Sequence, residues 1–237
     1  MATFQGLVRK TILNTNVQFD RLGNVSSNIA NYNTTAYKSV RFEQMLDENG
    51  YLNGVVRTNY VPGSALRTEQ KLDVALKGVG FIPVTSKTGD VTYTRDGSFK
   101  LDKDGYLITN DNCLVGDGIK IPANLYDLRI KPNGDVAAII ENGQPEKILG
   151  KIPVVNFQNP EGLKSVDGNK YVATKDSGEP ILMKKHTNIQ QGSLERSNVN
   201  IFTQVNDVMR LNASMLASFK LMKTIDDMYN KSINIKQ

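Results

Sequence analysis

The clearest hydrophobic pattern of the chain lies in its last forty residues. Ten positions there alternate steps of four and three residues, and eight of the ten are apolar. They are Ile201, Val205, Val208, Asn212, Met215, Phe219, Met222, Asp226, Tyr229 and Ile233. This period is typical of a helix with a coiled-coil seam. No Gly or Pro follows Gly192, so the pattern predicts a helix from about residue 200 to 235, roughly 50 Å long.

A weaker pattern of the same kind runs through the first thirty residues. Five of its eight seam positions are apolar, and the segment contains no Pro. The positions are Phe4, Val8, Thr11, Thr15, Gln18, Leu22, Val25 and Ile29. We therefore predict a second helix, which the Asn- and Thr-rich residues 31–35 end because their side chains compete for backbone hydrogen bonds.

Both predicted helices carry apolar residues outside their seams, so their buried faces are wider than one stripe. Either the two helices pair with each other in a monomer, or they also bind helices of other chains. We expect assembly contacts from Leu22, Val25, Ile29, Ile201, Val205, Val208, Met215, Phe219, Met222, Ile225, Tyr229 and Ile233.

The middle of the chain reads as short strands separated by turns. Its turn dipeptides are Asn49-Gly50, Asn53-Gly54, Asp96-Gly97, Asp104-Gly105, Asp117-Gly118, Asn133-Gly134, Asn142-Gly143 and Asp167-Gly168. Between them, residues 91–94, 98–101 and 106–109 are strand-like and close enough in sequence to predict consecutive hairpins.

The predicted fold class is therefore α+β with a mainly β body. Residues 1–35 form an N-terminal helix and residues 36–70 an extended linker. Residues 71–185 form a β-rich outer domain, and residues 186–237 contain the C-terminal helix. The two helices are expected to make a coiled-coil-like stalk.

Composition adds little to this picture. Hydrophobic residues make up 39% of the 237 residues, and there is no Trp, which fits an elongated protein with a modest core. The net charge is +5, from 29 Lys and Arg against 24 Asp and Glu. Lys184, Lys185 and His186 form the only dense basic spot, which is either solvated surface or a binding patch. No nucleic-acid-binding module accompanies it.

Candidate chemistry is sparse. The single histidine, His186, excludes a site with two histidine ligands, and the single cysteine, Cys113, is expected to be a small buried hydrophobe. Gly78 and Gly80 lack the third glycine of a phosphate-binding loop. The segment from Asp102 to Gly105 is better explained as a hairpin turn than as part of a calcium loop. We expect no cofactor, no metal, no small-molecule substrate and no enzymatic activity.

Neither a leader nor a membrane span is visible in the sequence. Residues 1–10 lack a basic start followed by an apolar core, so we expect no cleavable signal peptide. No segment approaches the ~20 apolar residues that a membrane-spanning helix needs.

Three stretches of sequence carry a recognisable pattern. LGNVSSNIANYNTTAYK spans residues 22–38, two linked segments lie between residues 72 and 117, and GSLERSNVN spans residues 192–200. The residues that carry the pattern are Asn28, Ile29, Ala30, Asn31, Asn33, Thr34, Lys38, Gly80, Phe81, Tyr93, Thr94, Arg95, Gly97, Phe99, Leu101, Gly105, Leu107, Gly192, Leu194, Glu195, Ser197, Asn198 and Val199.

In this order the segments resemble the flagellar basal-body rod and hook family, and within it rod proteins of the FlgF/FlgG type. Thr35-Ala36 departs from that pattern, because the family usually has Pro or Asn followed by Gly there. The short segment between residues 38 and 72 favours a proximal rod protein, whereas residues 159–163 look more like the distal type. The small β body makes a hook protein the less favoured reading.

The resemblance implies a structural subunit of a helical tube, with terminal helices inside and the β domain outside, that transmits torque from motor to hook. Implied partners are copies of the chain, other rod and hook subunits, and the flagellar type III export apparatus. The implied location is the basal body in the cell envelope and periplasm. Two alternatives stay open: a monomeric module that binds an envelope polymer such as peptidoglycan, and an enzyme that acts on such a polymer.

Overall fold

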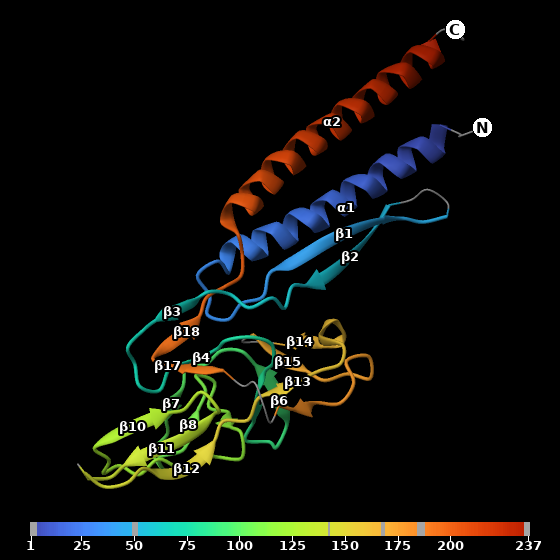
Figure 1. The fold of residues 1–237 in the computed structure, drawn as a ribbon. Helices are drawn as coiled ribbons and strands as arrows, with labels where there is room; N and C mark the ends of the chain where they lie inside the picture. Colours follow the sequence, from blue (N-terminus) through green and yellow to red (C-terminus); the bar gives the residue numbers. More distant parts are fainter. Residues whose placement is uncertain (1–3, 49–51, 142, 167–168, 184–187, 235–237) are drawn as a thin grey trace. The chain divides into compact units, whose positions relative to one another are not determined.

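The structure is a computed structural model that describes residues 4–48, 52–141, 143–166, 169–183 and 188–234 (Figure 1). The chain divides into two compact units. The helical unit contains residues 1–32, 39–59 and 199–237, and the β unit contains residues 33–38 and 60–198. The predicted order of helix, β-rich body and helix is confirmed.

Two long helices dominate the helical unit. Helix α1 spans Phe4–Ala30 and helix α2 spans Ile201–Asn234. The Gln18 amide donates to the Ser214 hydroxyl at 2.9 Å, and Arg21 pairs with Asp207 at 3.3 Å. Because higher numbers in α1 meet lower numbers in α2, the helices are antiparallel, and they run side by side in Figure 1.

Asn side chains mark both helix ends that adjoin the β unit in sequence. At the end of α1, the backbone and side-chain amides of Asn31 donate to the Ser27 carbonyl at 3.1 and 2.9 Å. At the start of α2, the Asn200 side chain accepts the backbone N–H of Thr203 at 3.2 Å. This N-cap satisfies a donor that would otherwise lack an intrahelical partner.

A β-hairpin packs against α1 in the same unit. Strands β1 (Val40–Leu46) and β2 (Leu52–Thr58) are antiparallel, with Val40 opposite Thr58 and Leu46 opposite Leu52. This hairpin lies within residues 36–70, where the sequence predicts an extended linker as well as turns at Asn49-Gly50 and Asn53-Gly54. Both strands are seven residues long, and α1 supplies the surface on which they pack.

The β unit is built from short strands. The largest sheet has seven strands in the order β14-β15-β6-β5-β9-β8-β7, and β10-β11-β12 form a second sheet. Three further pairs are β13–β16, β17–β4 and β18–β3. The bounds are β3 Ala65–Arg67, β4 Val74–Leu76, β5 Ile82–Thr85, β6 Val91–Thr94, β7 Lys100–Leu101, β8 Leu107–Ile108, β9 Leu114–Val115, β10 Asp127–Ile130, β11 Asp135–Ile139, β12 Lys147–Lys151, β13 Val155–Asn156, β14 Lys164–Val166, β15 Lys170–Val172, β16 Ile181–Leu182, β17 Ile189–Gln191 and β18 Ser193–Glu195, with a 3₁₀ turn at Pro160–Gly162.

The predicted series of consecutive hairpins is only partly right. Strands β7 and β8 pair across the turn from Asp102 to Gly105 as expected. Strand β6, however, pairs with β5 and β15 and not with β7. After β6 the chain meets β4 and not the next hairpin, because the Gly97 carbonyl accepts the backbone N–H of Val74 at 3.0 Å and Ser98 bridges Asp73.

Two clusters of buried side chains form the core of the β unit. The larger one is aliphatic, contains residues such as Ile82, Leu107 and Ile152, and includes Cys113, which is buried as expected. The smaller one is aromatic and surrounds Phe81. Within the described residues, neither helix has a stretch long and apolar enough to cross a membrane.

Candidate functional site: a buried charge cluster and an apolar helix face

Three charged side chains meet in the interior of the β unit. Lys38, Arg95 and Glu195 are each no more than 2% exposed. Charged residues are almost never buried this deeply unless they are paired, because burial removes their hydration. The cluster is therefore held by specific contacts.

Glu195 is the centre of this charge cluster. Its Oε2 accepts hydrogen bonds from Nε of Arg95 at 2.9 Å and lies 2.8 Å from the Nη2 atom of Arg95. Its Oε1 accepts from the Lys38 ammonium and from the backbone N–H of Gly63, the latter at 2.8 Å. Both carboxylate oxygens are thus satisfied, as a buried carboxylate requires.

The remaining donors of Arg95 bind a loop of backbone carbonyls. Its guanidinium donates to the carbonyls of Gly80, Gly78 at 2.9 Å and Leu76 at 3.3 Å. Gly78 and Gly80 have φ values of +115° and +118°, which side chains rarely tolerate. A Cβ on Gly80 would also lie 2.7 Å from Cγ1 of Val154. The segment from Leu76 to Gly80 therefore binds the Arg95 side chain through its backbone carbonyls, and we call it the glycine cup.

Lys38 completes the charge cluster from the segment that follows α1 in sequence. Its ammonium donates to the Val61 carbonyl at 3.1 Å as well as to Glu195. Burial lowers the pKa of Lys38 from 10.5 to about 8; Glu195 opposes this shift and the charge on Arg95 adds to it. The loss of hydration therefore outweighs the attraction of the carboxylate.

The charge cluster holds together segments that end at the boundary of the β unit, at residue 38 and at residue 198. Next to it, the backbone N–H of Ala36 donates to the Glu195 carbonyl at 2.8 Å. The backbone N–H of Asn198 donates to the Tyr37 carbonyl at 3.3 Å, and its side-chain amide donates to Val61 at 2.8 Å. Residues 36–38 and 195–198 are thereby fixed side by side within this unit.

The three sequence segments that carry the family pattern each supply one member of the charge cluster. The sequence points to Lys38, Arg95 and Glu195 only as parts of that pattern and does not predict that they touch. Glu195 lies 157 residues from Lys38 and 100 from Arg95. No local spacing rule reaches across such separations, so contact had to come from the fold.

Asn28 plays a comparable part in the helical unit. Its side chain donates to the Val40 carbonyl at 2.8 Å and accepts the Val40 N–H at 2.9 Å. The same amide group donates to the Gln204 side chain at 3.0 Å. This buried residue therefore links α1, the start of β1 and the first turns of α2.

The other pattern residues have mostly structural contacts. Phe81 and Tyr93 lie in the aromatic cluster, and each makes an edge-to-face contact with Phe157. Gly97 has no room for a side chain, because a Cβ would lie 1.9 Å from the Val74 carbonyl oxygen. Others are placed as follows: Ala30 and Asn31 at the end of α1, Thr34 in the following turn, Thr94 bonded to the Asn169 carbonyl, Gly192 before β18, Leu194 in β18, and Ser197, Asn198 and Val199 between β18 and α2.

Helix α2 has two different apolar faces. One face lies toward α1 and contains the buried Leu211, Met215 and Ile225 with the half-buried Val208 and Met222. The other face is exposed in this chain and contains Phe202, Val205, Met209, Leu216 and Phe219. Phe202 is 80% exposed and Phe219 47%. We call these the inner face and the outer stripe.

The predicted single seam of α2 runs between these two faces. Val208, Met215 and Met222 lie on the inner face, whereas Val205 and Phe219 lie on the outer stripe. Of the remaining predicted assembly residues, Val25 and Ile225 are buried, and Leu22, Ile29 and Ile201 are half-buried. Tyr229 is exposed, and the side chain of Ile233 lies outside the described residues. A heptad count finds the average direction of the apolar residues and cannot separate two adjacent stripes.

The hairpin adds further exposed apolar surface to the helical unit. Met45 and Leu46 of β1 and Val55 and Val56 of β2 are all exposed. Contiguous exposed apolar side chains on a single chain commonly mark a site of protein contact. The outer stripe and the hairpin are therefore the candidate interaction surfaces of this unit.

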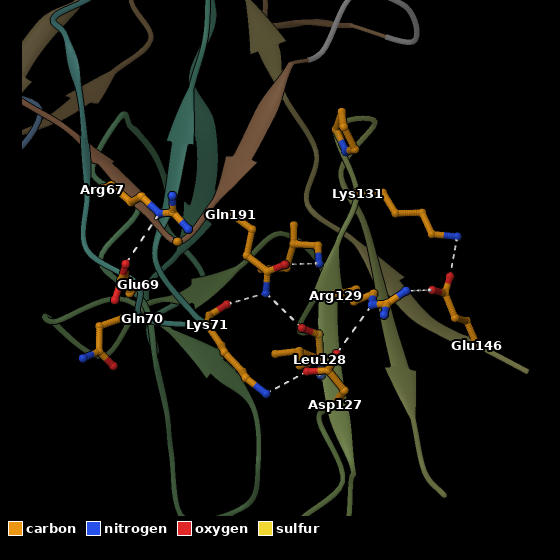
Figure 2. A pocket seen from close by; sticks show the side chains of 13 residues that line it. Arg67, Glu69, Gln70, Lys71, Asp127, Leu128, Arg129, Lys131, Glu146 and Gln191 are labelled. Carbon is orange, nitrogen blue, oxygen red and sulfur yellow. Dashed lines mark hydrogen bonds and ion pairs between the residues drawn. The ribbon is translucent and has the colours of Figure 1, made fainter. Parts of the chain in front are cut away.

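The β unit also has an open groove of about 830 Å³ (Figure 2). Its wall is a chain of alternating charges, with contacts of 2.7–3.5 Å, formed by Lys71, Asp127, Arg129, Glu146 and Lys131. The hydrogen bond from Lys71 lowers the pKa of Asp127. Gln191 donates to the Lys71 and Leu128 carbonyls across the floor. The opposite charges offset one another, so the groove is not a concentrated anion or cation site.

The part of the chain that the structure describes holds no group of three or more His, Cys, Asp or Glu residues that could bind a metal. The predicted basic spot at residues 184–186, which includes His186, lies outside that part. The Cys113 thiol lies 3.6 Å from the Lys170 ammonium, which also pairs with Asp111 at 2.9 Å. These contacts join segments of the β unit that lie far apart in the sequence.

Comparison with known protein families finds a match within the β unit. The model of the flagellar hook protein FlgE/F/G D1 domain matches residues 75–138, which cover the glycine cup and Arg95. The chain therefore contains a segment similar to the D1 domain of flagellar hook proteins.

Curated proteins that resemble most of this chain are flagellar basal-body rod proteins. The flagellar basal-body rod protein FlgG of Buchnera aphidicola subsp. Acyrthosiphon pisum is 30% identical over 87% of this chain and 90% of its own length. FlgG of Agrobacterium fabrum is 30% identical over 86% and 89%, and FlgF of Buchnera aphidicola subsp. Schizaphis graminum is 28% identical over 76% and 78%. The chain belongs to the flagellar basal-body rod protein family.

Proposed function

We propose that this chain is a structural subunit of the bacterial flagellar basal-body rod and that it acts by assembly and not by catalysis. The observation that carries the proposal is the outer stripe of α2, a row of large apolar side chains that are exposed in this chain. The family supplies the setting, because its curated relatives are named flagellar basal-body rod proteins.

The outer stripe would be buried by another subunit. Burying a large apolar side chain fully contributes about 1.5–3 kcal/mol, so five such residues supply a substantial part of a stable contact. If the partner surface differs from the stripe, the contact does not close on itself and repeats into a helical array. We infer that the partners are copies of this chain and other rod or hook subunits.

We infer that the two parts of the chain occupy different layers of such a tube. We infer that α1 and α2, from residues 1–35 and 186–237, form its inner layer and that residues 71–185 form its outer layer. A tube that transmits torque from motor to hook needs cohesive contacts, and the hairpin of residues 40–58 offers a further apolar surface for them. Both the proximal and the distal rod remain compatible with the relatives.

We further infer that the protein resides in the basal body within the cell envelope and periplasm. We infer that it arrives through the flagellar type III export apparatus. No cofactor or small-molecule substrate enters this function.

Incorporation of outer-stripe variants into basal bodies tests the proposal. Phe219→Asp places a charge on the outer stripe, whereas Ala217→Asp places the same charge at an exposed position outside both faces of α2. We expect Phe219→Asp to be absent from purified basal bodies and Ala217→Asp to be present. Equal incorporation of the two variants would refute a role of the outer stripe in assembly.

A further inference from the structure

The buried charge cluster contains more positive than negative charge. Lys38 and Arg95 are the cations and Glu195 is the carboxylate, and all three are shielded from water. With both cations protonated, the cluster holds one positive charge that no buried carboxylate within it balances. A buried charge of this kind is costly because the interior replaces water poorly.

Only one of the two cations can remove this imbalance. The arginine guanidinium does not lose its proton in proteins, whereas a lysine ammonium can. Neutral Lys38 would still reach Glu195 and the Val61 carbonyl, so the geometry of the cluster survives the loss of the proton. The ion pair between Arg95 and Glu195 would then be electrically balanced.

We propose that Lys38 makes the charge cluster a pH-sensitive latch, which holds residues 36–38 and 195–198 of the β unit together more firmly once mildly alkaline solution removes its proton. The adjacent backbone hydrogen bonds also join these two segments. This inference concerns the β unit alone and does not depend on the function proposed for the chain.

The sign of the effect follows from proton linkage. Burial lowers the pKa of Lys38 to about 8 in the folded chain, while the unfolded chain keeps the ordinary value of 10.5. Between these values the unfolded state binds more protons, so the free energy of unfolding rises with pH. Below about pH 8 both states are protonated at Lys38, and this contribution to the slope vanishes.

The surroundings of Lys38 do not reverse this sign in the same window. Arg95 and Glu195 are the charged groups that face it. The Tyr171 phenol interacts electrostatically with Arg95 and Glu195, and also with Tyr60 and Tyr37. Burial raises the pKa of Tyr171 well above its usual range, so ionisation of this phenol in the unfolded chain opposes the Lys38 effect only near and above pH 10, and it cancels in the comparison with Lys38→Met.

Chemical denaturation of the full chain between pH 7 and 10 tests the latch. We compare the unaltered chain with Lys38→Met, and with Lys71→Met, which removes an exposed lysine that is paired with Asp127. Relative to Lys38→Met, the unfolding equilibrium constant of the unaltered chain should fall by up to tenfold per pH unit above pH 8. Lys71→Met should keep that fall. Identical slopes in the unaltered chain and Lys38→Met would overturn the proposal.

A measurement without any substitution at Lys38 covers the case in which Lys38→Met fails to fold. The ¹³Cε resonances of the lysines report their protonation directly in the unaltered chain. The resonance assigned to Lys38 should titrate near pH 8. The proton affinity of Lys38 should therefore be at least tenfold lower than that of the surface lysines. Titration of Lys38 together with the other lysines would overturn the latch.

Discussion

At the residue scale, Glu195 joins three other segments of the β unit through its carboxylate. It accepts hydrogen bonds from Lys38, Arg95 and Gly63, which lie far apart in sequence, and it is 1% exposed. Removing one partner of a buried charged network leaves the others unpaired, which costs more than the network contributes to begin with.

Glu195→Gln is therefore expected to lower the free energy of unfolding by about 3–5 kcal/mol, because two buried cations lose their carboxylate. Glu179→Gln is the matched control, since Glu179 is exposed in the same unit. Urea denaturation measures both. A loss in Glu195→Gln that equals the loss in the control would show that the charge cluster does not hold this unit together.

Ala36 shows how the backbone can tolerate a departure from the family pattern. This chain has Ala where the family usually has Gly, and Ala36 adopts the left-handed conformation with φ of +57° while being 1% exposed. Alanine tolerates this region at a cost of about 1–2 kcal/mol, whereas β-branched residues are strongly disfavoured there.

Ala36→Val is expected to lower the free energy of unfolding by about 2 kcal/mol or more, through backbone strain and overpacking. Ala36→Gly should change it little, because relief of about 1 kcal/mol of strain is offset by losing a buried methyl worth about 0.8 kcal/mol. Thermal denaturation compares the two variants. A tolerated valine would contradict the left-handed backbone at residue 36.

At the element scale, the helices were predictable and their faces were not. A 3.5-residue repeat and the absence of Pro define α2 without any tertiary information. Which apolar residues meet α1 depends on where α1 lies, and this divides Met215 from Phe219. The same limit applies to β6, whose partners β5 and β15 are chosen by the sheet and not by the next turn.

The two faces of α2 should respond differently to the same charge. Met215→Asp is expected to reduce the helical circular dichroism signal of the dilute chain, because it removes buried contact with α1. Phe219→Asp should leave that signal nearly unchanged, because Phe219 is on the outer stripe. Equal loss of helicity in both variants would contradict the division of α2 into two faces.

At the scale of the whole molecule, the sequence predicted the order of the parts but not the contact that organises one of them. The resemblance named Lys38, Arg95 and Glu195 as pattern residues, and the fold alone brings them together. Their pairing depends on segments from both ends and from the middle of the β unit being in place. Such a contact leaves no local signature, because it is satisfied only after long-range folding.

The central claim is that the chain builds the rod, and electron microscopy of basal bodies from a strain that lacks the gene tests it most directly. The strain is complemented with the intact chain, or with a chain that ends at Asn200 and so keeps Lys38, Arg95 and Glu195 but loses α2. We predict that rods are missing or end at a fixed height without the gene, that the intact chain restores them, and that the shortened chain does not. Complete rods of normal length in the strain without the gene would contradict a structural role in the rod.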